Sequence, residues 1–224
     1  MLGTHIIVTF VVLTSIFSII LFSGRFNRQR RIEKLAKSYD RNFGEFIQMV
    51  TKTLNAKDPY TADHSVRVME YSVKIANTLR LPESEIELLK QACLLHDIGK
   101  ISIPDGILNK KDILTDKERE HILRHPEVGR QILSTVSEFK EILDIIYAHH
   151  ERVDGKGYPD GRTRDEIPLL ARILAVADTY DAMLPERPYR RAKTKDEAIQ
   201  ELHNVKGTQL DEEIVDKFIE VLSA

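Results

Sequence analysis

Apolar residues recur at spacings of three and four along most of this chain, which is the pattern of α-helices that bury one face. From Asp58 onward several such segments follow one another, separated by polar stretches that contain Gly or Pro. No segment shows a convincing alternation of apolar and polar residues, the pattern of a half-buried strand. The pattern predicts an all-α globular domain.

Capping residues predict where the helices of this domain begin, because Ser, Thr and Asp side chains accept hydrogen bonds from the first free amides and Pro fits the first turn. The expected starts are Asp58-Pro59, Pro82, Thr115 with Glu118, His125-Pro126, Pro168, Thr194 with Glu197, and Asp211. Gly99 is expected to end the helix that begins after Pro82.

The first 24 residues differ from the rest, since they contain no Asp, Glu, Lys or Arg and residues 6–22 are almost wholly apolar. About 17–25 such residues cross a bilayer as a helix. Five Lys or Arg residues follow within residues 25–34, and a flank of this kind stays in the cytoplasm. We therefore expect residues 1–24 to be a single-pass anchor in the inner membrane. A cleaved signal peptide fits less well, because the basic residues follow the apolar run and no small-residue cleavage site is evident.

Residues 25–55 form a basic juxtamembrane and linker helix with one apolar stripe. Its first half is compatible with either a dimer-forming signalling helix or a simple spacer, and Gly44 weakens a continuous coiled coil. We favour the interpretation that its second half is the first helix of the globular part. The catalytic domain itself is expected to span residues 56–224. The stripe consists of Ile32, Leu35, Tyr39, Phe43, Phe46, Val50 and Leu54.

Composition narrows the classes of function. Charged residues make up 30% of the chain and nearly balance, with a formal net charge of −2, so a nucleic-acid polymer is not expected as a partner. The single Cys93 lies among apolar residues in KQACLLHD, which predicts a small core residue and no intrachain disulfide.

The chemistry centres on the sequence LLHDIGK, where an apolar helix ends in His96 and Asp97. Burying this pair without partners would cost on the order of several kcal/mol, and either metal coordination or a hydrogen-bonded structural pair would satisfy it. Asp178, within ILAVADTY, has the same need for a cation or several donors. Further candidates are His64, His125, His149 and His150.

Taken singly, each of these histidines is more simply a surface or hydrogen-bonded core residue, and His5, His121 and His203 are left under that interpretation. The adjacent pair His149-His150 is harder to explain by packing. Five imidazoles and two carboxylates exceed the needs of one tetrahedral ion, but they suit two octahedral ions that share Asp97.

The segments HDIGK, HPEVG, HHERVDGKGYP and ARILAVADTYDAM, followed by RPYR, resemble the HD-GYP family of bacterial cyclic di-GMP phosphodiesterases, a branch of the HD phosphohydrolases. The similarity runs from about Asp58 to the terminal GTQLDEEIVDKF. The resemblance implies an HD-type helical bundle that hydrolyses cyclic di-GMP to linear pGpG, with GMP as a possible further product. Hydrolysis would use a hydroxide activated by two divalent ions, iron or manganese.

The resemblance also implies roles for individual residues. The metal ligands would be His64, His96, Asp97, His125, His149, His150 and Asp178, with Asp97 as the bridging carboxylate. Lys100 would meet the scissile phosphate, and Asp97 and Lys100 would be the catalytic residues.

The remaining implied positions are contacts with the substrate. Arg187 and Arg190 would hold the nucleotide phosphates, and Tyr158 would line the pocket. Asp181 matches a carboxylate near the metal-bound water. Some family members have, four residues before the first ligand, a glutamate that helps hold a third metal; here that position is Tyr60, so two ions are expected.

The loop after HDIGK also departs from the family, because LNKKDILT lacks a proline that members commonly have after its lysine. This changes loop stiffness and is not expected to change the chemistry. Two other functions stay open: hydrolysis of another cyclic dinucleotide or nucleotide, and a non-catalytic receptor for cyclic di-GMP. The intact set of ligands argues against the receptor.

Overall fold

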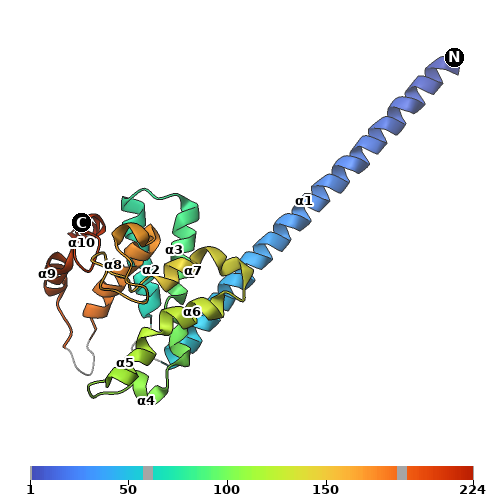
Figure 1. Cartoon of the computed structure of the whole chain (residues 1–224). Coiled ribbons are helices and arrows are strands. Elements are labelled where there is room, and N and C mark those ends of the chain that lie inside the picture. The colour runs from blue at the N-terminus through green and yellow to red at the C-terminus, as the bar shows by residue number, and fades with distance from the viewer. Residues whose placement is uncertain (1, 58–62, 186–190, 224) are drawn as a thin grey trace. The chain divides into compact units, whose positions relative to one another are not determined.

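The computed structural model of the chain describes residues 2–57, 63–185 and 191–223 (Figure 1). All regular secondary structure within these ranges is helical. Two isolated β-bridges, Asp154 with Thr163 and Lys206 with Leu210, do not extend into strands. The predicted all-α fold is confirmed, whereas the helix start expected at Asp58-Pro59 lies outside the described residues.

Helix α1 runs without interruption from Leu2 to Lys57 and contributes to two compact units, Met1–Phe46 and Ile47–Ala224. Where side chains are described, no helix has the length and apolar character needed to cross a membrane. The expected span, residues 6–22, lies almost wholly outside that part of the chain. The membrane anchor therefore gains no support here and stays a prediction from the sequence.

The second unit contains twelve further helical segments in the described ranges, counted along the element order. They are α2 (His64–Thr78), α3 (Glu83–Leu95), η2 (Ile98–Ser102), α4 (Asp105–Leu108), α5 (Asp116–Leu123), α6 (His125–Leu133), η3 (Ser137–Ile142), α7 (Leu143–Tyr147), η4 (Arg164–Glu166), α8 (Leu169–Met183), α9 (Lys195–Val205) and α10 (Glu212–Ser223).

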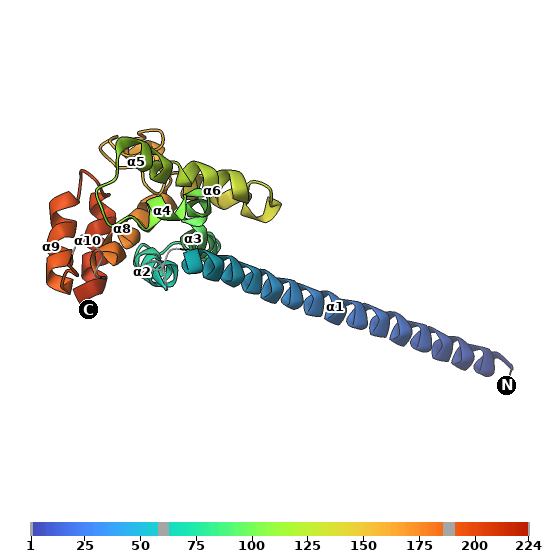
Figure 2. The same cartoon turned by 90° about the horizontal axis from the view of Figure 1, so that it is seen from below.

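Helix α8 is the central element of this unit, because it packs against α2, α3, α7, α9 and α10. Its apolar side chains, from Leu170 to Met183, are buried on more than one face. Helices α9 and α10 lie side by side next to α8, as both views show (Figure 2). An aspartate on such a helix is brought into the interior of the unit.

The end of α1 belongs to the second unit, since Ile47 and Leu54 are buried there. The Thr51 hydroxyl donates to the carbonyl of Leu94 at 3.3 Å, just before His96. This part of α1 is the first helix of the second unit, which is the interpretation that the sequence favoured. The unit starts before residue 56, where the sequence analysis placed the domain boundary.

Most expected helix starts are confirmed. Thr115 and Thr194 both form complete capping boxes. Pro82 and Pro168 occupy the N-caps of α3 and α8. The Asp211 carboxylate accepts hydrogen bonds from two amides in the first turn of α10.

The prediction that Gly99 ends a helix was wrong. Helix α3 already ends at Leu95, and Gly99 lies inside η2. A Cβ atom at this position would lie 1.9 Å from the carbonyl oxygen of His125. Glycine is therefore needed here so that the backbone of η2 can contact the backbone of α6.

Candidate metal centre

The candidate ligands come from five regions of the second unit. His64 and His125 are the first residues of α2 and α6, and Asp178 lies within α8. The pair His96-Asp97 directly follows α3, and the pair His149-His150 follows α7 after Ala148. Most of these side chains thus stand at helix ends, where backbone direction changes and neighbouring elements converge.

The structure brings the candidates together in two groups. In each group, one ligand atom from every residue lies within 4.8 Å of the others. The first group is Asp97, His125, His149 and His150, and the second group is His64, His96 and Asp178. Together they contain all seven residues that the resemblance implies as ligands.

Asp97 lies between the two groups. Its Oδ1 atom is 3.5 Å from Nε2 of His125, a member of the first group. Its Oδ2 atom is 3.3 Å from Nε2 of His96, a member of the second group. One oxygen therefore faces each group, which is the arrangement of a carboxylate that bridges two ions.

The tautomers of three histidines follow from their hydrogen bonds. Nδ1 of His96, His125 and His149 lies 2.5–2.7 Å from the backbone carbonyl three residues earlier in each case. Because a carbonyl oxygen only accepts, Nδ1 must donate and Nε2 keeps its lone pair. Metal-ligating histidines are usually oriented by such a bond from the second ring nitrogen.

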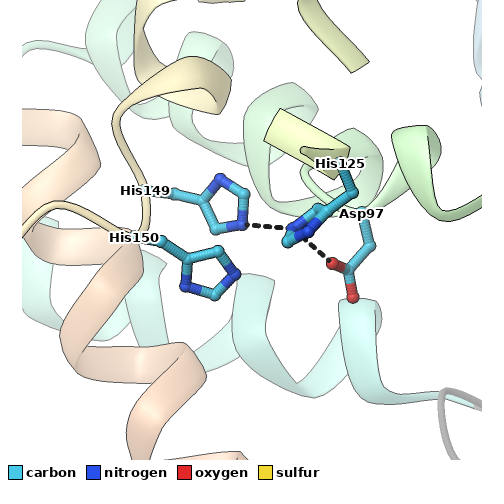
Figure 3. Close-up of side chains that lie close together, drawn as sticks. All are labelled: Asp97, His125, His149 and His150. Carbon is cyan, nitrogen blue, oxygen red and sulfur yellow. Dashed lines mark hydrogen bonds and ion pairs between the residues drawn. The ribbon is translucent and has the colours of Figure 1, made fainter. Parts of the chain in front are cut away.

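The Nε2 atoms of these three histidines meet no hydrogen-bond donor among the described residues. Nε2 of His96 is buried without a hydrogen bond in the described structure. Nε2 of His125 and Nε2 of His149 face each other at 3.3 Å (Figure 3). Two lone pairs that face each other at this distance repel unless a cation lies between them. Two nitrogens that each bind one ion at a metal–nitrogen distance of about 2.1 Å lie about 3.0–3.4 Å apart for octahedral or tetrahedral angles, which includes the observed distance. The residues fit a metal ion.

The charge states of the donors also suit a divalent cation. Burial lowers the pKa of His125 to about 4 and that of His150 to about 3, so both imidazoles are neutral at pH 7. Burial opposes ionisation of Asp97, but Lys100, whose Nζ lies 2.7 Å from Oδ2, holds the pKa of this carboxyl well below its usual value. Neutral imidazoles and ionised carboxylates are the forms that bind metals.

His64 is held differently from the other histidines. Nε2 lies 3.1 Å from Oδ1 of Asp178, and Nδ1 lies 2.7 Å from Oδ2 of Asp181. Burial lowers the pKa of His64, but these two carboxylates outweigh it and raise the pKa to about 9 in the metal-free protein. Arg67, one turn further along α2, donates to both oxygens of Asp181 at 2.7 and 2.9 Å.

Asp181, for which the resemblance implies a place near the reacting water, contacts His64 and Arg67 in the structure. Its side chain is fully buried behind His64, and its oxygens are occupied by His64 and Arg67. Sequence reasoning did not identify Arg67. The signal available was its spacing of three from His64, which places both side chains on one face of a helix.

Lys100 and Tyr158, two expected substrate contacts, lie beside the candidate ligands. Lys100 reaches Asp97 from η2, and the Tyr158 ring stacks on His150 with centroids 4.8 Å apart. Burial raises the pKa of Tyr158, so its phenol stays protonated. Arg187, Arg190 and Tyr60 lie outside the described residues, so the phosphate contacts and the argument for two ions rather than three stay predictions.

Glu151 is a further residue that sequence reasoning missed. Its buried carboxylate accepts hydrogen bonds from the amides of Asp160, Gly161 and Arg162 at 2.7–3.1 Å. The loop after His150 is thereby closed on itself. The available signal was an acidic residue beside the ligand pair and ahead of a glycine-rich loop, whose amides need acceptors.

The remaining histidines and the single cysteine were interpreted as ordinary surface or core residues. His121 and His203 are exposed and lie outside both groups. Cys93 is fully buried, and burial raises the pKa of its thiol to about 12. Its predicted role as a core residue is confirmed.

The fold and the site define an all-helical protein with a buried cluster of histidines and aspartates whose donors suit metal ions. A model of the HD domain family matches residues 48–214. The chain belongs to the HD domain family.

Named relatives lie among phosphodiesterases of cyclic dinucleotides, which confirms the resemblance to the HD-GYP branch. The 3'3'-cGAMP-specific phosphodiesterase 3 of Vibrio cholerae is 41% identical over 162 residues, 72% of this chain and 35% of that protein. The cyclic di-GMP phosphodiesterase response regulator RpfG of Xanthomonas campestris is 38% identical over 177 residues, 78% of this chain and 47% of that protein. The chain thus spans less than half the length of either relative.

A solved structure supports the fold. The HDG"Y"P protein Bd1817 of Bdellovibrio bacteriovorus superposes with a TM-score of 0.61 over 81% of this chain and 61% of that chain, at 20% identity. At this level of identity the similarity shows a shared HD-type arrangement of helices only.

Proposed function

We propose that this protein hydrolyses a phosphodiester bond of a cyclic dinucleotide, with cyclic di-GMP as the first candidate and linear pGpG as the product. GMP is a possible further product. The observation that carries the proposal is the position of Asp97. Its two oxygens face two separate groups of ligands, and Lys100 lies against the same carboxylate.

Two divalent ions, for which iron or manganese suits the mixture of imidazole and carboxylate donors, would supply Lewis acidity and an activated water. His125, His149, His150 and Asp97 would hold one ion, and His64, His96 and Asp178 the other, with Asp97 shared. His96, His125 and His149 are already oriented for this by their backbone hydrogen bonds.

Lys100 would neutralise negative charge that grows on the phosphate oxygens in the transition state. The Lys100 side chain is 20% exposed, so its ammonium group can contact a ligand while it stays close to Asp97. Tyr158 would contact the substrate with a ring fixed on His150 and a phenol that donates. Arg187 and Arg190 would bind the nucleotide phosphates in the forked geometry that guanidinium groups allow.

A second candidate substrate is 3'3'-cGAMP. The relative named for this activity is 41% identical to the chain, compared with 38% for the cyclic di-GMP relative reported above. Both substrates present the same phosphodiester ring, so the metal centre treats them alike and the bases decide preference. Competition between the two dinucleotides in one reaction distinguishes the candidates.

The proposal includes a membrane anchor in residues 1–24, a catalytic unit on the cytoplasmic side of the inner membrane, and a homodimer formed through α1. Deleting residues 1–22 is expected to release a soluble protein that keeps its activity. Loss of activity in a folded deletion variant would instead implicate the segment in regulation by dimerisation.

The function is tested by incubating metal-loaded protein with cyclic di-GMP and separating the nucleotides by chromatography. We expect pGpG to be formed, its formation to stop after chelation, and its formation to resume when manganese or ferrous iron is added. A folded protein with two bound ions that leaves cyclic di-GMP and 3'3'-cGAMP intact would contradict the proposal. A receptor would still bind cyclic di-GMP in that experiment.

A further inference from the structure

Behind His64, on the side away from the metal groups, lie two charged residues that belong to neither group. The Asp181 carboxylate is 0% exposed and contacts Nδ1 of His64 at 2.7 Å. The Arg67 guanidinium bonds both oxygens of this carboxylate. The three residues form a continuous chain from the surface to the ligand.

The Nδ1 partner of His64 differs from that of the other histidines. His96, His125 and His149 donate from Nδ1 to a carbonyl of their own preceding turn. For His64, the first residue of α2, the structure shows a side-chain partner in place of a carbonyl. Its Nδ1 partner comes instead from α8.

Helix α8 contacts both nitrogens of this imidazole. Asp178 and Asp181 are three residues apart on one face of α8, and the first contacts Nε2 while the second contacts Nδ1. If an ion replaces the contact between Nε2 and Asp178, the bond to Asp181 alone fixes the plane of the ring.

Arg67 holds Asp181 in place, because its guanidinium group donates to both carboxylate oxygens. Without these two bonds the buried carboxylate would lose the contacts that fix its orientation, and its bond to Nδ1 of His64 would then lose its direction. The Arg67 side chain is 38% exposed, so its charge can be removed without opening a cavity in the core.

We propose that Arg67 and Asp181 are positioning residues for His64, and that binding of the ion held by His64, His96 and Asp178 depends on them. Binding of the ion held by Asp97, His125, His149 and His150 does not. This inference rests on the two-ion centre of the proposed function.

The test compares Arg67→Met with Arg191→Met. Arg191 makes the same fork, on Glu197, but at an exposed site outside the metal groups. The full chain of each variant is loaded with Mn²⁺ alone, and bound metal is counted while free Mn²⁺ is varied. We expect two ions per chain in the wild type and in the Arg191 variant.

In Arg67→Met we expect the ion held by His64, His96 and Asp178 to bind about 10- to 100-fold more weakly, while the ion held by the other group is retained. Electron paramagnetic resonance should then show the hyperfine spectrum of an isolated Mn²⁺ in place of a coupled pair. Arg67→Lys should restore part of the affinity, since an ammonium group can make one of the two bonds.

Unchanged affinity for both ions in Arg67→Met would overturn the inference, as would a wild-type protein that binds a single ion. If Arg67→Met fails to fold, Asp181→Asn gives the same test, because it keeps the shape of the side chain and removes its charge. A wild type that binds two ions without cleaving cyclic dinucleotides would refute the proposed function and leave this inference intact.

Discussion

Replacing Gly99 with alanine should separate the two elements that carry Asp97 and His125. The added Cβ would lie 1.9 Å from the carbonyl oxygen of His125 and 2.6 Å from the amide nitrogen of Gly129. Both atoms are backbone, so neither can rotate away. Real Cβ contacts are essentially never shorter than 3.0 Å, so η2 and α6 must move apart by at least 3.0 − 1.9 = 1.1 Å.

A shift of this size is about twice the tolerance of roughly 0.5 Å within which a functional site keeps its geometry. Asp97 lies two residues before Gly99, and His125 itself supplies the clashing oxygen. Overpacking a core costs about 1–3 kcal/mol, and we expect the upper end or more because the obstacle is backbone. Weaker metal binding should accompany the loss of stability.

Gly106→Ala is the matched control. It makes the same chemical change at a helical position where a Cβ would meet nothing within 4 Å. We expect the free energy of unfolding to stay within about 0.5 kcal/mol of the wild type. Urea unfolding followed by circular dichroism, together with metal content, measures both effects. Gly99→Ala with the unfolding midpoint and metal content of the wild type would refute the close contact between η2 and α6.

Three further predictions follow from single contacts. Lys100→Met should lower kcat about 10²- to 10³-fold at unchanged metal content, because a charge beside the phosphate is lost; a fall in metal content instead would assign Lys100 to assembly of the site. Glu151→Gln should lower the free energy of unfolding by about 1–3 kcal/mol, since an amide cannot satisfy all three loop N–H groups, and faster proteolysis within residues 152–162 would locate the effect. Metal-free protein should lose stability as the pH falls from 6.5 to 4. Burial lowers the pKa of folded His125 to about 4, so between pH 6.5 and pH 4 only the unfolded chain takes up a proton at this residue. The pKa of folded His64 is raised to about 9, so the stability that His64 contributes is fully present throughout this range. A urea midpoint that does not change between pH 7 and pH 4.5 would contradict this sign.

The all-α fold and the grouping of the candidate ligands were predictable because their signals are local. Helical periodicity needs only neighbouring residues, and capping boxes such as that of Thr115 and Glu118 are complete within four positions. The seven candidate ligands stand in short motifs whose order along the chain carries the resemblance. The structure adds what no motif contains, which is that Asp97 presents one oxygen to each group.

The features that escaped prediction depend on contacts between elements distant in sequence. Gly99 looked like a helix end because its contact with α6 is not visible in the local pattern. The spacing of Asp178 and Asp181 placed both on one face of α8, but only the packing of α2 on α8 shows that His64 lies between them. An arginine such as Arg67 is expected at the surface from its residue type alone, and its proposed role follows from the buried carboxylate that it contacts.

The most direct test of the central claim is a product assay on anaerobically purified protein whose metal content is measured in the same sample. We predict two iron or manganese ions per chain and conversion of cyclic di-GMP to pGpG. In Asp97→Ala, which removes the carboxylate shared by the two groups, both the bound ions and the product should be lost while the helical circular dichroism spectrum stays. Wild-type activity in a folded Asp97→Ala variant, or two bound ions without cleavage of any cyclic dinucleotide in the wild type, would contradict the account.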